Sequence, residues 1–180
     1  MRQRRILRTL IRTLLLGLAV GLTLVAAAPS AWAADAHPGS WTFGAGAGFL
    51  GDTPDGTAFA MNFYADAFLT RNLSLGPLLQ LGFTGDMSQV GVSGQVKYWI
   101  DIPGTDNRLK VVPEAGIGFV HTGFRNDDTS WLIVLGASAD YRLNNKLSVT
   151  GTLLLNFTSL DTDRATGADV MPGFTVGVRF

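Results

Sequence analysis

Residues 171–180, MPGFTVGVRF, alternate between apolar side chains and small or polar ones. Phe174, Val176, Val178 and Phe180 occupy every second position, and Thr175, Gly177 and Arg179 lie between them. Successive side chains of a β-strand point to opposite faces of its sheet. The spacing therefore predicts a strand with one continuous apolar face and one polar face.

The same alternation recurs along the chain. It divides the sequence into segments 40–49, 58–70, 73–84, 88–100, 109–121, 130–143, 147–158 and 171–180, each bounded by turn residues. Short links such as Arg71-Asn72 alternate with links that contain aspartates, and no amphipathic helical segment lies between them. Eight consecutive alternating strands with hairpin-length links predict an all-β antiparallel meander.

The polar face of these strands carries charged residues in the middle of the segments. They are Asp66, Lys97, Glu114, Asp140 and Arg142, and Arg179 follows on the last strand. A soluble barrel or sandwich turns its apolar face inward, whereas a membrane barrel turns it outward to lipid and keeps the polar face for its lumen. The two architectures therefore place these charges on opposite sides of the sheet.

Three features favour the membrane barrel. The polar face is rich in Gly, Ser and Thr and poor in Lys and Glu, which suits a crowded interior. Aromatic residues cluster near strand ends, as interface girdles require: Trp41, Phe49, Phe59, Phe83, Tyr98, Phe119, Trp131, Tyr141 and Phe157. The sequence ends at Phe180, directly after the last strand. We therefore expect an eight-stranded antiparallel up-and-down transmembrane β-barrel with its charges inside.

Some residues depart from the simple alternation. Apolar side chains fall on the lumen face at Leu78, Val112, Val120, Leu132, Val134 and Leu154, and Phe68 and Trp99 join them near the short turns. A narrow barrel can accommodate these residues as interior packing. Pro77 and Pro113 lie inside segments, where each removes a ladder hydrogen bond, so we expect a bulge or a local distortion at both.

The N-terminus has the features of a secretory signal peptide. Residues 2–12 contain five arginines and no acid, residues 13–28 are uncharged, and Ala31 and Ala33 supply the small residues of a cleavage site. Residues 1–33 are thus expected to be removed, although a retained membrane anchor is the alternative. Residues 34–180 then form one barrel domain with nine basic and fourteen acidic residues and no cysteine. This charge gives no attraction for nucleic acid.

With these features the sequence resembles the small outer-membrane barrels of Gram-negative bacteria, the group of OmpA-like, OmpX and opacity proteins. The resemblance covers the whole mature chain and includes FLTRNLSLG (68–76), YRLNNKLSV (141–149) and the terminal FTVGVRF (174–180). It implies a monomer in the bacterial outer membrane, with lipid and lipopolysaccharide as partners. It also implies that the assembly machinery reads Phe174, Val176, Val178 and Phe180 as a C-terminal signal. No peptidoglycan-binding domain follows Phe180, so an anchoring role is not supported.

No arrangement of residues predicts catalysis or a cofactor. Lipid A deacylase barrels of similar size use a His-x-Ser pair, but here His121 is followed by TGF, and His37 lies near the mature N-terminus. Gly46, Gly48 and Gly51 have the G-x-G-x-x-G spacing of a dinucleotide site, yet a turn follows them where a helix is required. We therefore expect no catalytic residue and no cofactor.

A dedicated metal site is also not predicted. Asp161, Asp163 and Asp169 resemble part of a calcium loop, but Gly167 is at its seventh position and Pro172 at its twelfth, where glycine at the sixth and an acid at the twelfth are needed. Acidic outer loops could still share divalent ions with lipopolysaccharide.

The expected function is that of a non-enzymatic outer-membrane barrel with a plugged polar lumen. Eight strands enclose a space only wide enough for side chains, and the nearly balanced lumen charges predict pairing. The role would lie in envelope structure or in surface interaction with an unknown ligand through the extracellular loops. A lipid-modifying enzyme and a narrow channel for small or hydrophobic solutes are the alternatives.

Overall fold

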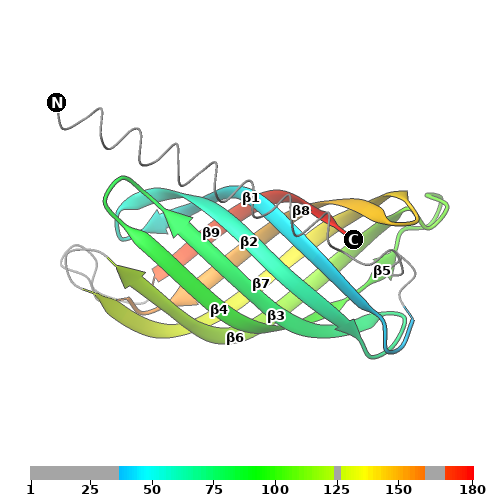
Figure 1. Ribbon diagram of the computed structural model, residues 1–180, viewed down its shortest axis with the longest axis horizontal. Helices are drawn as coiled ribbons and strands as arrows, with labels where there is room; N and C mark the ends of the chain where they lie inside the picture. The colour runs from blue at the N-terminus through cyan, green and yellow to red at the C-terminus, as the bar shows by residue number, and fades with distance from the viewer. Residues whose placement is uncertain (1–36, 124–126, 161–168) are drawn as a thin grey trace. The chain divides into compact units, whose positions relative to one another are not determined.

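The computed structural model describes residues 37–123, 127–160 and 169–180, and these residues form a barrel of tilted strands (Figure 1). The strands are β1 (Trp41–Thr53), β2 (Gly56–Phe68), β3 (Leu73–Phe83), β4 (Ser88–Tyr98), β5 (Ile100–Asp101), β6 (Leu109–Gly123), β7 (Asp128–Asn144), β8 (Leu147–Thr158) and β9 (Asp169–Arg179). The short β5 continues β4 beyond Trp99, because both pair with β6. With β4 and β5 counted as one strand, the described residues form a barrel of eight strands.

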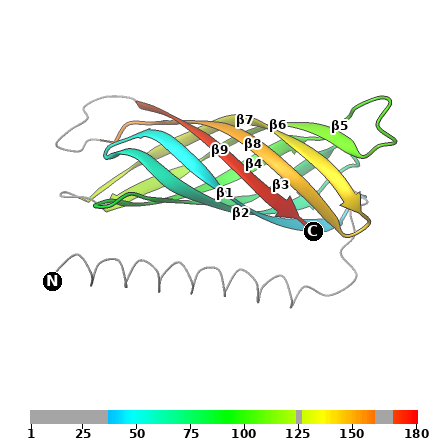
Figure 2. The same ribbon diagram turned by 90° about the horizontal axis from the view of Figure 1, so that it is seen from above.

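The sheet closes on itself. Every neighbouring pair is antiparallel, and β4 pairs with β6 to complete the ring. The first and last strands, β1 and β9, pair from Gly44↔Arg179 to Leu50↔Gly173, and Figure 2 shows β9 between β1 and β8. Two further backbone hydrogen bonds, of 2.8 and 2.9 Å, join Phe43 and Phe180. The predicted eight-stranded antiparallel up-and-down barrel is confirmed, and closure leaves its backbone without a free edge.

Two hairpins are longer than the sequence pattern indicated. β1 and β2 stay paired as far as Thr53↔Gly56, where Pro54 and Asp55 form the turn, and Gly56 takes a positive φ of 89°. β6 and β7 likewise stay paired as far as Thr122↔Asp128. The expected segments stopped at 49, 58, 121 and 130. Apart from the buried Leu50, these outer strand tips consist of glycine and polar residues, so the alternation that lipid requires is missing there.

Both prolines distort the ladder without a bulge. Pro77 pairs with Gly94 of β4, but on its other side the β2–β3 pairing lapses between Tyr64↔Leu78 and Ala67↔Leu75. The register is the same before and after this gap.

At Pro113 the pairing with Ala137 of β7 is intact, and the gap lies on the other side, between Lys97↔Glu114 and Ile100↔Val111. This gap separates β5 from β4. The expected local distortion is therefore an interrupted pairing, because proline has no N–H to donate to one neighbour.

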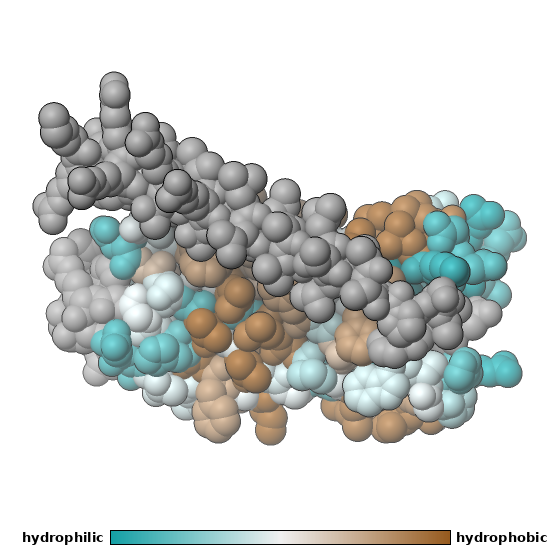
Figure 3. Space-filling view, in the orientation of Figure 1, coloured by the Kyte–Doolittle hydropathy of each residue, from teal (hydrophilic) through white to brown (hydrophobic). Residues whose placement is uncertain are grey.

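The outward face of the barrel is apolar. The side chain of Ile117 is 73% exposed, that of Phe119 70% and that of Leu153 62%. In Figure 3, hydrophobic residues occupy much of the visible middle of the barrel, and hydrophilic residues lie mainly towards its ends. The described residues contain no helix that is long and apolar enough to cross a membrane. Exposed apolar strands around buried charges are the reverse of a soluble barrel and fit a barrel surrounded by lipid.

Inside, apolar residues form two clusters. The larger contains Leu78, Val120, Leu132, Val134 and Leu154 with Leu50, Ala58, Ala60, Met87, Leu160 and Met171, and the smaller contains Phe68, Trp99 and Val112. The apolar residues expected on the lumen face are thus buried as interior packing. The charged groups occupy the space left to them by these clusters.

Candidate functional site

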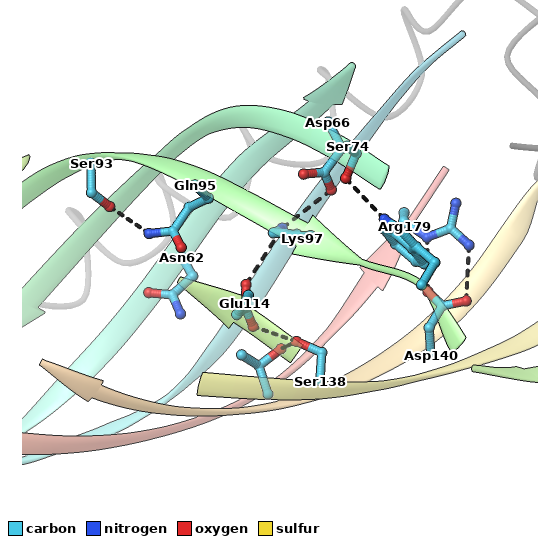
Figure 4. Close-up of polar contacts among 12 residues, drawn as sticks. Asn62, Asp66, Ser74, Ser93, Gln95, Lys97, Glu114, Ser138, Asp140 and Arg179 are labelled. Atoms are coloured by element: carbon cyan, nitrogen blue, oxygen red, sulfur yellow. Dashed lines mark hydrogen bonds and ion pairs between the residues drawn. The ribbon is translucent and has the colours of Figure 1, made fainter. Parts of the chain in front are cut away.

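Lys97 of β4 lies between two buried carboxylates. Its Nζ is 3.2 Å from Oδ2 of Asp66 on β2 and 3.7 Å from Oε2 of Glu114 on β6 (Figure 4). The same ammonium group is 4.0 Å from the centroid of the Tyr64 ring. One cation therefore compensates two acids inside a low-dielectric interior, where an unpaired charge is costly.

A chain of hydrogen bonds extends this cluster to two more strands. The Ser138 hydroxyl of β7 donates to Oε1 of Glu114 over 2.7 Å and is 2.9 Å from the Thr152 hydroxyl of β8. Polar contacts consequently connect β2, β4, β6, β7 and β8 across the lumen. The hydrogen bond to Oε1 of Glu114 and the ion pair at its Oε2 together hold this side chain in one orientation.

A second ion pair lies nearer the C-terminus of β9. Nε and Nη2 of Arg179 donate to the two carboxylate oxygens of Asp140, each over 2.8 Å, and Nη2 also donates to Oγ of Ser148 over 3.2 Å. The guanidinium carbon is 4.9 Å from the centroid of the Trp99 ring. This bidentate geometry is the strongest arrangement of charge-assisted hydrogen bonds between an arginine and a carboxylate. It ties the last strand to β7 and β8.

The structure places the sixth predicted lumen charge differently. The contacts above involve Asp66, Lys97, Glu114, Asp140 and Arg179, all at most 7% exposed. Arg142 is half-buried at the end of the barrel that carries the β2–β3, β5–β6 and β7–β8 connections, called here the short-turn end, where it lines a recess. Its backbone N–H donates to the carbonyl of Arg108 over 2.8 Å. Arg142 lies two residues beyond Asp140 on the same face of β7, at the end of the lumen.

Tyr64 is a site residue that the sequence reasoning missed. Its ring packs against Gly44 of β1, which is its direct partner across the ladder. The face of β1 that carries Gly44, Gly46 and Gly48 is therefore bare because neighbouring atoms fill that space. An aromatic residue opposite a glycine was the available signal, but it becomes readable only when the register is known.

Substitution of Gly44 should disrupt this contact. A Cβ at Gly44 would overlap the Tyr64 ring, whereas a Cβ at Gly94, on the outward face, meets nothing within 4 Å. We expect Gly44→Val to lower the free energy of unfolding by about 1–3 kcal/mol, the usual cost of overpacking. Gly94→Val should change it by less than about 0.5 kcal/mol. Urea titration of both variants in lipid vesicles measures the difference, and equal stabilities would contradict the proposed packing.

Two small cavities lie in the described lumen. One of about 20 Å³ is lined by Asn62, Tyr64, Lys97, Glu114 and neighbouring residues, and one of about 10 Å³ lies by Asn62, Gln80 and Gln89. A water molecule needs roughly 10–15 Å³ by this measure. The side-chain oxygen of Asn62, which accepts no hydrogen bond from the protein, borders both cavities. They are of a size for single water molecules.

A solved structure shares this architecture. The crystal structure of neisserial surface protein A superimposes with a TM-score of 0.61, 14% sequence identity and coverage of 77% of this chain and 95% of that chain. The two proteins share a fold. No family model matches the sequence, and a search of curated proteins found no significant match.

Two other structures match less closely. A de novo designed transmembrane β-barrel gives a TM-score of 0.46, 15% identity and coverage of 79% of this chain and 95% of that chain. The outer membrane protein Ail of Yersinia pestis gives 0.44, 10% identity and coverage of 77% and 99%. At these identities the likeness to neisserial surface protein A concerns the fold alone.

The predicted girdle residues lie on the outside of this outer-membrane type of barrel. Trp41, Phe49, Phe59, Phe83, Tyr98, Phe119, Trp131 and Tyr141 are exposed and Phe157 is half-buried. Phe49 pairs with Phe59, and Phe59 pairs with Phe83, so three strands carry a phenylalanine at one ladder position. This position is near the end of the barrel that carries the β1–β2, β3–β4, β6–β7 and β8–β9 connections, called here the long-loop end. Trp41, Tyr98 and Tyr141 are near the short turns.

The residues of the predicted assembly signal follow the β1–β9 seam. Phe174 and Val176 are exposed on the outward face, and Val178 and Phe180 are half-buried. Phe180 exchanges both of its backbone hydrogen bonds with Phe43. The C-terminal residues thus take part in closing the barrel.

The histidines and acids do not form a reactive cluster in the described part of the chain. The exposed His121 has Nδ1 2.8 Å from the Thr129 hydroxyl at the long-loop end, and His37 contacts Ser40 at the other end. Residues 37–123, 127–160 and 169–180 contain no group of three His, Cys, Asp or Glu residues suited to a metal ion. Asp161 and Asp163 lie outside these ranges, and only the backbone of Asp169 is described.

Proposed function

We propose that this protein is a non-enzymatic integral protein of the bacterial outer membrane with a closed lumen, acting in envelope structure or surface interaction through its extracellular loops. The observation that carries the proposal is an apolar outer face enclosing charges that are paired with one another. The outer face of such a barrel needs an apolar environment, which the membrane provides. Closure by ion pairs suits a scaffold better than a transport channel.

The closed lumen is supported by the dimensions of the interior. Lys97 and Arg179, each with its carboxylate partners, extend across the space, and the cavities beside them hold at most about 20 Å³. Passage of a solute would require ion pairs to separate in a low-dielectric environment. We therefore expect no steady conductance in planar bilayers. Stable single-channel steps from the unaltered protein would favour the narrow-channel alternative.

The outer-membrane location is supported by residues 2–28, whose arginines and uncharged apolar run are typical of an export signal, and by the apolar outward face of the strands. In this setting the partners are outer-membrane lipid, lipopolysaccharide and, during biogenesis, the assembly machinery. The described long-loop end carries Asp52, Asp55, Asp86, Asp127 and Asp128. These acids would face the cell exterior and provide a surface for an unknown ligand. We expect the protein to act as a monomer.

The location is tested by fractionation. The mature protein should sediment with outer membranes, resist carbonate extraction and change its gel mobility on boiling, because a closed barrel survives detergent until it is heated. Recovery as a soluble periplasmic monomer with one gel mobility would contradict the proposal.

The surface role is tested in cells. A deletion strain should lose adhesion or serum resistance, and a variant with residues 161–168 replaced by a Gly/Ser linker should show the same loss while its membrane level stays normal. Restoration by the linker variant would place the function elsewhere than this loop. Loss of lipid A modification in the deletion strain would support the enzymatic alternative.

A further inference from the structure

A recess of about 510 Å³ opens at the short-turn end of the barrel. It is lined by residues from separate parts of the chain: His37, Arg71, Asn72, Asp101, Asn107, Lys110 and Arg142. Three cationic side chains and one acid give this lining a formal charge of +2 with His37 neutral. The recess thus concentrates positive charge in a concave surface, where the field is stronger than on a flat one.

An apolar cluster lies beside the recess. Trp99 packs on Phe68 with ring centroids 5.2 Å apart, and both are buried together with Val112. The lining residue Asn72 is fixed to this cluster, since its side chain donates to the Trp99 carbonyl and its own carbonyl accepts from the Trp99 N–H, both over 2.7 Å.

Its wall is held by local hydrogen bonds. Asp101 forms an ion pair with Lys110, its partner across the β5–β6 ladder. In the following loop the Thr105 hydroxyl donates to the carbonyl of Ile102 over 2.7 Å, and Asp106 and Asn107 adopt left-handed φ angles of 50° and 57°. A wall that is already ordered loses little entropy when a ligand binds.

We propose that this recess binds an oxyanion, a phosphate or carboxylate group, through the guanidinium groups of Arg71 and Arg142 with Lys110 beside them. Arginine presents a planar fork of donors that matches such oxygens. Among the described residues Arg71 forms no ion pair, so its donors are open to a ligand. Asp101 holds the Lys110 side chain at the recess. A free anion and the phosphate of a phospholipid headgroup share this chemistry.

The test uses the folded mature protein in nanodiscs of phosphatidylcholine. Inorganic phosphate is titrated while NMR follows the backbone amides of Asn72, Asn107 and Lys110. We expect saturable shifts of these amides and about tenfold weaker binding in Arg71→Gln, the effect of losing one charge-assisted contact. Arg71 is exposed on a turn, and the gel mobility shift on boiling verifies that the variant is folded.

Lys146→Gln is the matched control, because Lys146 is an exposed cation of another turn at the same end and is not part of the lining. Its affinity for phosphate should be unchanged. A second arm replaces part of the lipid by phosphatidylglycerol. Shifts that appear with this lipid and require Arg71 identify a headgroup site, whereas shifts with phosphate alone identify a soluble anion. No saturable shift in either arm, or equal weakening by Lys146→Gln, overturns the proposal.

Discussion

Replacing Lys97 by methionine should lower the free energy of unfolding in lipid vesicles by about 3–5 kcal/mol, the cost of leaving a buried ionic group without its partner. Asp66 is fully buried and Glu114 is 7% exposed, and both depend on the Lys97 ammonium group. Without it, two carboxylates face each other across the lumen. The loss should also draw water into the interior and raise the conductance in planar bilayers.

Two further variants make this expectation specific. Lys146→Met removes an exposed lysine at a turn and should change stability by less than about 0.5 kcal/mol. The triple variant Lys97→Met, Asp66→Asn, Glu114→Gln removes the acids together with the cation and should recover most of the loss, because replacing a whole buried ionic group is far less costly than breaking it. Urea titrations compare the variants. A Lys97→Met barrel as stable as the unaltered one would show that the two carboxylates do not need this cation.

Replacing Leu153 by arginine should cost about 2–4 kcal/mol, as expected for a cation on the lipid face near the middle of the bilayer. Leu153 lies in the middle of β8, and its side chain is 62% exposed on the outward face. Folding into lipid vesicles, followed by urea titration, measures this cost. The same substitution at Leu155 should behave similarly, since that side chain also points outward.

The control for this prediction is the same substitution at another depth. Leu143 is 51% exposed on the outward face but lies just before the β7–β8 turn, so Leu143→Arg should cost only about 0–1 kcal/mol. Thr152→Asn, on the lumen face beside Leu153, should also be mild in comparison. If Leu143→Arg were the more damaging variant, or if Thr152→Asn exceeded Leu153→Arg, the assignment of faces and depth would be inverted.

The sequence predicted the strands and their two faces because both depend on neighbouring residues. A period of two along the chain, such as Leu153 and Leu155 against Thr152 and Asn156, indicates which side chains share a face without reference to any other strand. The limit appeared at the outer ends of β1 and β6. There the strands continue beyond the lipid, and the alternation that revealed them is no longer needed.

The partners inside the barrel were decided by the tertiary structure alone. Lys97 lies 31 positions from Asp66, and Arg179 lies 39 from Asp140, so no local spacing relates them. The sequence by itself placed such charges on one face of the sheet, because side chains alternate along a strand, and the small polar residues of that face together with the aromatic positions favoured the lumen. Their pairing, the Tyr64 ring over Gly44 and the basic recess depend on strand register and ring closure, which set the heights of all strands together and are not encoded in any one segment.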